Sequence, residues 1–361
     1  MESVYIHIPF CSHICSYCDF CKILHLEKFT DAYLDSLHQE ILDTYDGERI
    51  KTLYIGGGTP SCLNKKERTK LIRILSIFKL DPDVEYTFEC NPADIDDDLL
   101  DDLVALGVNR ISIGVQSFDK DNLKFLERDV DYNDLEEKIA KIRDRGIDNI
   151  NLDLMYALPN EKLATVKKDL TKLLSLKPTH ISTYSLIIEE HTKINNEGVK
   201  NIDPDLDRKM YDSIIKVLEK NNFHHYEVSN FALPGYESKH NLNYWNNGEY
   251  YGFGLGASGF KDGFRYTNTK NLDEYMDGKI RIEENLLTYQ DQMDNEIMLG
   301  FRKTEGINID DFYEKYGTNI QDVYPKVKEL LASKDLVYKN GFLYIPKDKL
   351  YVMNEILVNI L

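Results

Sequence analysis

The sequence predicts an α/β fold in which parallel strands alternate with helices. Short runs of apolar, β-branched and aromatic residues have the composition of buried strands. These runs cover residues 4–8, 52–55, 85–88, 110–115, 149–154 and 180–186. The segments between most of them repeat apolar residues at spacings of three and four, as amphipathic helices do. Those segments cover residues 27–45, 65–78, 97–106, 132–145 and 164–176. The alternation predicts helical crossovers between parallel strands.

The distinctive residues of the chain follow the strand runs, which is the third observation behind this fold class. Cysteines, glycines, prolines and polar residues gather at residues 9–21, 56–60, 89–92, 116–118 and 153–159. In open parallel sheets and in barrels alike, ligands bind at the carboxyl ends of the strands. We therefore expect one face of the fold to carry the chemistry. The six-unit pattern by itself fits an open sheet and a barrel equally.

The second half of the chain has a different texture. Residues 230–263 are rich in Gly, Asn and Tyr and poor in helical periodicity, which indicates extra strands and loops. Helical patterns return at residues 291–301, 309–316 and 323–333, and residues 336–345 read as a hairpin about Asn340-Gly341. We predict three parts: a main α/β domain (1–229), connecting strands and loops (230–289) and a small winged-helix-like α+β domain (290–361).

Charge and composition exclude several classes of function. The 361 residues carry a net charge of −18, which disfavours a nucleic-acid partner. The sequence has no apolar run long enough for a membrane anchor and no basic leader before its first strand run. We therefore expect a cytoplasmic protein without a stable membrane anchor.

The cysteines point to a metal centre. Cys11, Cys15, Cys18 and Cys21 lie within eleven residues, whereas Cys62 and Cys90 stand apart and are expected to be small buried residues. Crowding of this kind in a chain of this size favours metal ligation over a disulfide framework. Zinc commonly takes two separated pairs of ligands, and no second pair follows.

The spacing Cys11-x3-Cys15-x2-Cys18 favours a 4Fe-4S cluster held by three thiolates. Three ligands leave one iron open to chelate the amino and carboxylate groups of S-adenosylmethionine. Electron transfer from such a cluster breaks a carbon–sulfur bond of the sulfonium and yields a radical that abstracts hydrogen. The alternative is that Cys21 is a fourth ligand, which would leave a centre for electron transfer alone.

Several motifs together resemble one known family. Tyr-Ile-His-Ile-Pro-Phe-Cys at residues 5–11, the cysteine triad, Gly-Gly-Gly-Thr-Pro at 56–60 and Gly-Val-Gln-Ser-Phe at 114–118 are similar to those of the radical SAM group that contains oxygen-independent coproporphyrinogen III oxidase and HemW. The resemblance spans nearly the whole chain. It implies that the main domain is a partial (β/α)6 radical SAM barrel.

The resemblance also suggests which residues bind S-adenosylmethionine. Glycines after a strand let the backbone approach a ligand closely and can expose its amides. Carboxylates at strand ends accept hydrogen bonds from ribose hydroxyls, and an arginine can grip a carboxylate with two parallel bonds. The implied residues are Tyr5, Tyr17, Gly57, Gly58, Thr59, Glu89, Gln116, Arg128 and Asp153. Many relatives carry a histidine soon after the arginine, where this chain has Asp-Val-Asp at 129–131.

Two features bear on the choice within the family. Only four residues precede Tyr5, whereas the oxidases carry an N-terminal extension, and they usually continue the triad as Cys-x-Cys. His-Asn-Leu-Asn-Tyr-Trp at 240–245 matches the His-Asn-x-x-Tyr-Trp signature of HemW heme chaperones. A neutral histidine can ligate heme iron while aromatic rings pack on the macrocycle.

On that resemblance we expect His240, Tyr244 and Trp245 to contact heme, which the protein would deliver to acceptor proteins, and we expect an electron donor for the cluster. The alternatives are oxidative decarboxylation of coproporphyrinogen III to protoporphyrinogen IX and a radical reaction on another substrate. The alternative for Trp245 is a structural role as a core anchor.

Overall fold

The computed structural model describes residues 3–128 and 132–361, and it contains all six predicted strands. They are β1 (Ser3–Ile8), β4 (Arg49–Gly57), β5 (Lys79–Cys90), β6 (Arg110–Gln116), β7 (Asn149–Tyr156) and β8 (His180–Ser185). Each pairs in parallel with the next, in the order β1-β4-β5-β6-β7-β8. The predicted α/β class is therefore confirmed, and residues 129–131 lie outside the described part of the chain.

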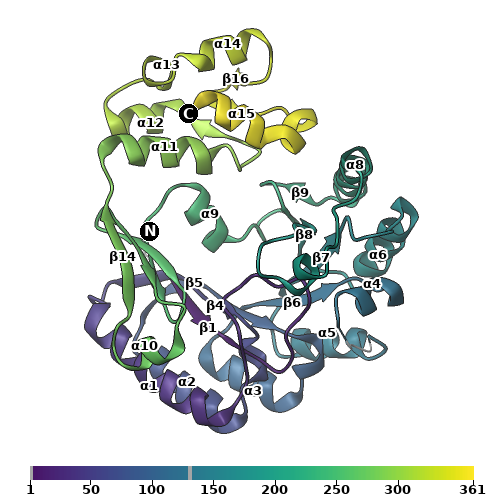
Figure 1. Ribbon diagram of the computed structural model, residues 1–361, viewed down its shortest axis with the longest axis vertical. Coiled ribbons are helices and arrows are strands. Elements are labelled where there is room, and N and C mark those ends of the chain that lie inside the picture. The colour runs from purple at the N-terminus through teal and green to yellow at the C-terminus, as the bar shows by residue number, and fades with distance from the viewer. Residues whose placement is uncertain (1–2, 129–131) are drawn as a thin grey trace.

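The same sheet continues beyond these six strands on both sides. β11 (Tyr250–Phe253) pairs in parallel with β1, and β12 (Ser258–Lys261), β13 (Phe264–Asn268) and β14 (Arg281–Leu286) follow as antiparallel strands. On the other side β10 (Asn230–Ala232) and β9 (His224–His225) are added antiparallel to β8. The sheet has twelve described strands and curves around an interior that stays open on one side (Figure 1).

Helices cover the outer face of this sheet (Figure 1). They are α1 (Glu27–Thr44), α2 (Lys65–Leu75), α3 (Asp97–Leu106), α4 (Lys120–Phe125), α5 (Leu135–Asp144), α6 (Leu163–Ser175) and α8 (Pro204–Lys220). Their ends follow local chemistry. Asn64 and Glu67 form a capping box at the start of α2, and α3 starts at the cap Asp96 and stops at Gly107, whose φ is 81°.

The two faces of the sheet differ in polarity. Along β1, Val4, Ile6 and Ile8 are fully buried in the apolar core beneath the helices. Because side chains alternate along a strand, Tyr5 and His7 point the other way, into the interior of the curved sheet. The interior is therefore lined with polar side chains, and the apolar core lies outside it.

The C-terminal part is a small helical unit with its own three-stranded sheet, β15-β17-β16. Its elements are α11 (Tyr289–Gly300), β15 (Ile307–Asn308), α12 (Ile309–Tyr316), α13 (Ile320–Val323), α14 (Lys326–Ala332), β16 (Val337–Lys339), β17 (Phe342–Tyr344) and α15 (Met353–Ile360). The predicted hairpin is present, and Asn340 and Gly341 have the positive φ angles of its turn. The single helix expected at 323–333 is divided because Pro325 disfavours a helical conformation at Tyr324.

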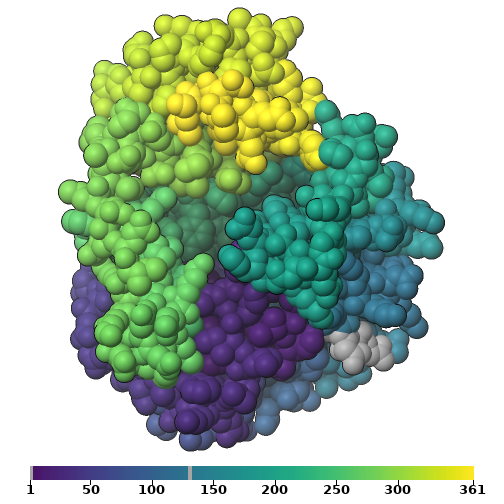
Figure 2. All heavy atoms as spheres, in the orientation of Figure 1, coloured from purple at the N-terminus to yellow at the C-terminus, as the bar shows by residue number. Residues whose placement is uncertain are grey.

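Figure 2 shows the surface hollowed between this C-terminal unit (yellow), the antiparallel strands (green), the N-terminal segment (purple) and the teal segment after β8. Among the described residues, no helix combines the length and apolarity needed to cross a bilayer. The boundaries of the three predicted parts stay a prediction, although β11–β14 clearly extend the main sheet.

Candidate functional site

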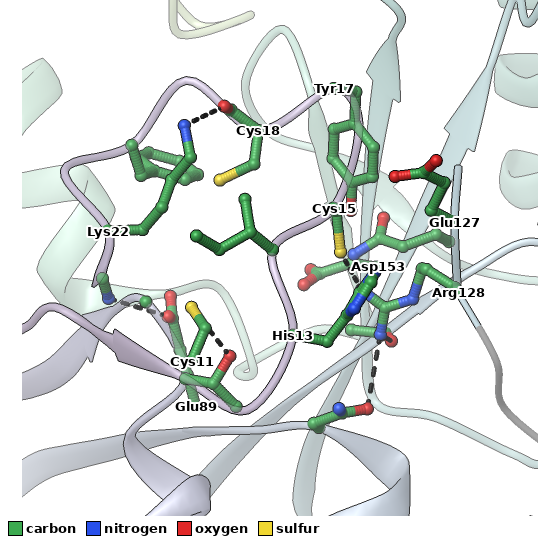
Figure 3. A pocket seen from close by; sticks show the side chains of 18 of the residues that line it. Cys11, His13, Cys15, Tyr17, Cys18, Lys22, Glu89, Glu127, Arg128 and Asp153 are labelled. Carbon is green, nitrogen blue, oxygen red and sulfur yellow. Dashed lines mark hydrogen bonds between the residues drawn. The ribbon is translucent and has the colours of Figure 1, made fainter. Parts of the chain in front are cut away.

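A cavity of about 590 Å³ lies at the carboxyl ends of the parallel strands, where the sequence predicted the chemistry. Figure 3 shows side chains of the loop after β1 and of the ends of β5 and β7 turned into it. Most of the residues assigned to cluster and cofactor line it: Cys11, Cys15, Tyr17, Cys18, Gly57, Gly58, Thr59, Glu89, Gln116, Arg128 and Asp153. The structure thus brings together residues from five separate segments.

The cysteine loop is held at both ends and in the middle. Short strands β2 (Phe10–Cys11) and β3 (Ile23–Leu24) pair with each other and close it. The Nε2–H of His7 donates to the carbonyl oxygen of Cys21 over 2.7 Å, so Nδ1 accepts the Tyr5 hydroxyl at 2.9 Å. Burial lowers the pKa of His7, which keeps the ring neutral for this bridge. Tyr5 is not among the described cavity-lining residues and acts on the loop through His7.

The glycines after β4 serve close packing. A Cβ on Gly58 would lie 2.7 Å from backbone atoms of Pro9 and Phe10, and one on Gly57, whose φ is 113°, would lie 2.7 Å from the His7 ring. The end of β4 can therefore press against the cysteine loop only if these positions lack side chains.

The backbone amides of this segment are already used inside the protein. Gly57 N–H donates to Glu89 Oε2 at 3.1 Å, Gly58 N–H to the Ile8 carbonyl at 2.8 Å and Thr59 N–H to the Phe10 carbonyl at 2.7 Å. The expectation that they are exposed for a ligand is corrected, because the segment is a cavity wall whose amides are satisfied. The Thr59 hydroxyl lies 3.5 Å from Cys11 Sγ.

The three predicted cluster cysteines share the cavity, and their sulfur atoms lie around one region of it (Figure 3). Burial raises the pKa of Cys11 to about 11 and also raises that of Cys18, so a positive centre nearby would favour ionisation of these two thiols. No three potential ligands among the described residues lie close enough to hold a single metal ion. A set of three thiols in one cavity is a donor set that an iron–sulfur group takes.

Cys21 is not among the described lining residues of the cavity. Its side chain packs against Gly256, where an added Cβ would come within 3.1 Å of the Cys21 sulfur. This position supports a triad of ligands and an uninvolved fourth thiol.

Two carboxylates, from β5 and β7, line the same cavity as the cysteines. Glu89 accepts the Tyr54 hydroxyl on Oε1 at 2.6 Å and the Gly57 amide on Oε2, and burial raises its pKa to about 7. Asp153 accepts the Asn151 amide at 2.7 Å, and burial raises its pKa as well. Both carboxylates line the cavity and can accept further hydrogen bonds there.

Arg128 is a cation without an anionic partner among the described residues. Its Nη2 donates to the Gly114 carbonyl at 2.6 Å, Nη1 lies 3.9 Å from Cys15 Sγ, and Nε has no hydrogen-bond partner there. A buried guanidinium in this state leaves room for an incoming carboxylate. The neighbouring Gln116 has a φ of 70°, a costly conformation for a non-glycine residue, and it also lines the cavity.

Sequence reasoning missed several cavity-lining residues: Lys22, Asn91, Ser112 and Tyr184. Asn91 and Tyr184 lie just after β5 and near the end of β8, so their position at strand ends was the available signal. Tyr17 lines the cavity; burial raises the pKa of its phenol, and the nearby Arg128 guanidinium partly offsets that rise.

The motif at residues 240–245 lies elsewhere, on a helix that the glycine- and asparagine-rich texture did not predict. Helix α9 (Lys239–Trp245) begins at Ser238, whose side chain accepts the Asn241 amide. Glu85 accepts the Lys239 amide at 2.9 Å and the His240 amide at 3.0 Å, so a carboxylate caps the positive end of the helix. Of these capping groups only Ser238 is visible in the local sequence, because Glu85 lies far away in the chain.

His240 points from α9 into the interior of the curved sheet and is 1% exposed. Its Nδ1 lies 2.8 Å from Thr52 Oγ1, which itself donates to Ser3, so Nδ1–H is the donor. Nε2 therefore accepts the Tyr244 hydroxyl at 2.8 Å. Burial, with a contribution from Arg110, lowers the pKa of His240 to about 3, so the ring is neutral.

Trp245 ends the same helix, with the Arg302 guanidinium 5.5 Å from its ring centre. Its indole N–H is buried without a partner among the described residues. The residues assigned to heme thus lie next to one another, but the Tyr244 hydroxyl occupies Nε2 of His240 in this conformation.

Comparison with known proteins agrees with this geometry. Residues 5–173 match the radical SAM superfamily and residues 287–347 match the HemN C-terminal domain. A protein described as heme chaperone HemW from Lactococcus lactis is 40% identical over 348 residues, which cover 94% of this chain and 91% of the relative. HemW of Bacillus subtilis is 38% identical over 94% of this chain and 93% of its own, and HemW of Escherichia coli is 34% identical over 91% and 90%.

A solved structure supports the fold. Coproporphyrinogen III oxidase (HemN) from Escherichia coli, a radical SAM enzyme, superposes with a TM-score of 0.87 at 23% identity, covering 99% of this chain and 89% of that one. At that identity the likeness establishes the architecture, a radical SAM barrel with a small C-terminal domain.

Proposed function

This chain belongs to the HemW family of radical SAM proteins, and on that premise we propose that it is a cytoplasmic heme chaperone. It binds a 4Fe-4S cluster through Cys11, Cys15 and Cys18, S-adenosylmethionine beside that cluster, and heme at the helix that carries His240. It passes heme to acceptor proteins and takes electrons for the cluster from a separate donor protein.

The observation that carries the cofactor assignment is the meeting of three thiols, two buried carboxylates and a guanidinium that has no carboxylate partner among the described residues in one cavity. Arg128 is positioned to pair with the cofactor's carboxylate, and Glu89 and Asp153 to accept hydrogen bonds from its hydroxyl or ammonium groups. Gly57 and Gly58 form a wall without side chains. When bound, the cluster and cofactor supply one-electron cleavage of a carbon–sulfur bond.

The hydrogen bonds of His240 support its role as a heme ligand. With Nδ1–H donating to Thr52, the ring is fixed in the tautomer whose Nε2 lone pair can bind iron. In this structure the Tyr244 hydroxyl occupies that lone pair, so ligation requires the hydroxyl to leave and α9 to shift. Tyr244 and Trp245 then supply aromatic surface for the macrocycle.

The test is hemin titration of anaerobically reconstituted protein, followed by the heme absorption band. We expect His240→Ala to weaken binding by about tenfold or more, in the range found when metal-site contacts are removed. His224→Ala is the matched control, because His224 is an exposed histidine of the same chain. Unchanged binding in His240→Ala removes that residue from the proposal. Turnover of coproporphyrinogen III by the same preparation contradicts the chaperone assignment.

A further inference from the structure

Three inward-facing residues of β4 connect the cofactor cavity to helix α9. Thr52, Tyr54 and Gly56 alternate along the strand and therefore point to the same side. In the register of the sheet, Thr52 lies beside Ser3 and Glu85, at the end where α9 is capped. Gly56 lies at the cavity end, where an added Cβ would be 2.8 Å from the Glu89 carboxyl. Tyr54 stands between the two ends.

Tyr54 touches both sites directly. Its hydroxyl donates to Glu89 Oε1 at 2.6 Å, and Glu89 lines the cavity. Its ring stacks on the His240 ring, with centroids 5.1 Å apart and planes inclined by 29°. One side chain therefore bridges a candidate cofactor ligand and the candidate heme ligand.

The far side of His240 is fixed too. Thr52 holds Nδ1 and Tyr244 holds Nε2, and the Tyr244 ring meets the His240 ring at 4.8 Å. With Tyr54 in place, the imidazole is held in the interior, where the iron of a macrocycle cannot reach Nε2. Release of His240 requires this stack to loosen.

We propose that Tyr54 is a positioning residue through which occupancy of the cofactor cavity holds His240 in its withdrawn position and so weakens heme ligation. The inference rests on the proposed function of both sites. A ribose hydroxyl that donates to Glu89 favours the ionised carboxylate, which is the form that best accepts the Tyr54 hydroxyl. An anchored Tyr54 keeps its ring against His240. By linkage, heme must weaken cofactor binding by the same factor.

The first test needs no heme, because Trp245 is the only tryptophan in the chain and ends α9. Reconstituted protein with an oxidised cluster is titrated with S-adenosylmethionine while tryptophan fluorescence is recorded. We expect a saturable change in wild type and a much smaller one in Tyr54→Phe, which keeps the stacking ring and removes only the hydroxyl. Tyr86→Phe is the control, since that buried hydroxyl on β5 has no partner among the described residues.

The second test measures the hemin dissociation constant with and without saturating S-adenosylmethionine. We expect the cofactor to raise it by about fivefold or more in wild type and in Tyr86→Phe, and by less than about twofold in Tyr54→Phe. The proposal is overturned if S-adenosylmethionine leaves the hemin dissociation constant of wild type unchanged or lowers it, or if it has an equal effect on Tyr54→Phe. If Tyr54→Phe does not fold, the wild-type result alone decides. Failure of wild type to bind hemin refutes the chaperone function instead, and the fluorescence titration still reports whether the cavity reaches α9.

Discussion

Replacing Glu89 by glutamine should stabilise the protein at alkaline pH, although it removes a residue that we assign to cofactor binding. Burial raises the pKa of Glu89 from 4.5 to about 7. At about 1.36 kcal/mol per pH unit, the ionised carboxylate then costs the fold about 3 kcal/mol. This is an upper value, because the side chain lines a cavity that admits some solvent screening.

The sign follows from proton linkage. Between pH 4.5 and about 7 the folded protein keeps the Glu89 proton that the unfolded chain releases. Stability therefore falls as the pH rises through this window, and the full cost is present above the folded pKa. Glu89→Gln removes the titration and keeps the shape, but it loses one of the two accepted hydrogen bonds, worth about 1 kcal/mol.

We expect Glu89→Gln to be more stable than wild type by about 1–2 kcal/mol near pH 8 and to gain little or nothing near pH 5.5. Urea unfolding of the cluster-free protein, followed by far-ultraviolet circular dichroism at both pH values, measures this difference. A gain of equal size at the two pH values, or a less stable variant near pH 8, would refute the argument. Titration of the same variant with S-adenosylmethionine should show weakened binding, which explains why a costly acid is retained.

Two further predictions concern the cysteine loop. Cys21→Ser should retain the iron content and the cofactor affinity of wild type, because Cys21 packs against Gly256, whereas Cys15→Ser should lose both. Iron analysis after anaerobic reconstitution measures the difference. The reverse result would mean that other thiols bind the cluster. Gly58→Ala should lower the free energy of unfolding by about 1–3 kcal/mol and reduce iron retention, because its Cβ meets the backbone of Pro9 and Phe10. Gly114→Ala, whose Cβ meets mainly the flexible side-chain end of Gln116 at 3.1 Å, should change stability less under the same urea titration.

The sequence predicted those parts of the fold that depend on local pattern. The six strands and five of their helices have periodicities that a single segment displays, and the turn at Asn340-Gly341 demands positive φ angles that these two residues tolerate. Helix α9 was missed because it is only seven residues long and part of its N-terminal capping comes from Glu85, more than 150 positions away in the chain. The parallel pairing of β11 with β1 was missed for the same reason, since it joins the start of the chain to residues near 250.

The candidate site divides in the same way. The thiols follow β1, and Glu89 and Asp153 lie near the carboxyl ends of β5 and β7, so the topology brings them together, whereas Arg128 reaches the cavity from the segment after α4. What the amides of residues 57–59 do could not be predicted, because their acceptors lie on β1, the cysteine loop and β5. The hydrogen bond that holds His240 in the interior could not be predicted either, since its partner Thr52 looks like an ordinary strand residue in the sequence.

The polar interior of the sheet is itself an argument for communication between its two ends. Arg110 is 2% exposed, has an Nε without a partner among the described residues, and shares the interior with Glu89 and with the neutral rings of His180 and His240. Packing this space with apolar side chains would be more stable, because buried charges and unpaired polar atoms are costly. These costly polar groups fill the space between Glu89 and His240, through which a ligand on Glu89 can alter the position of His240.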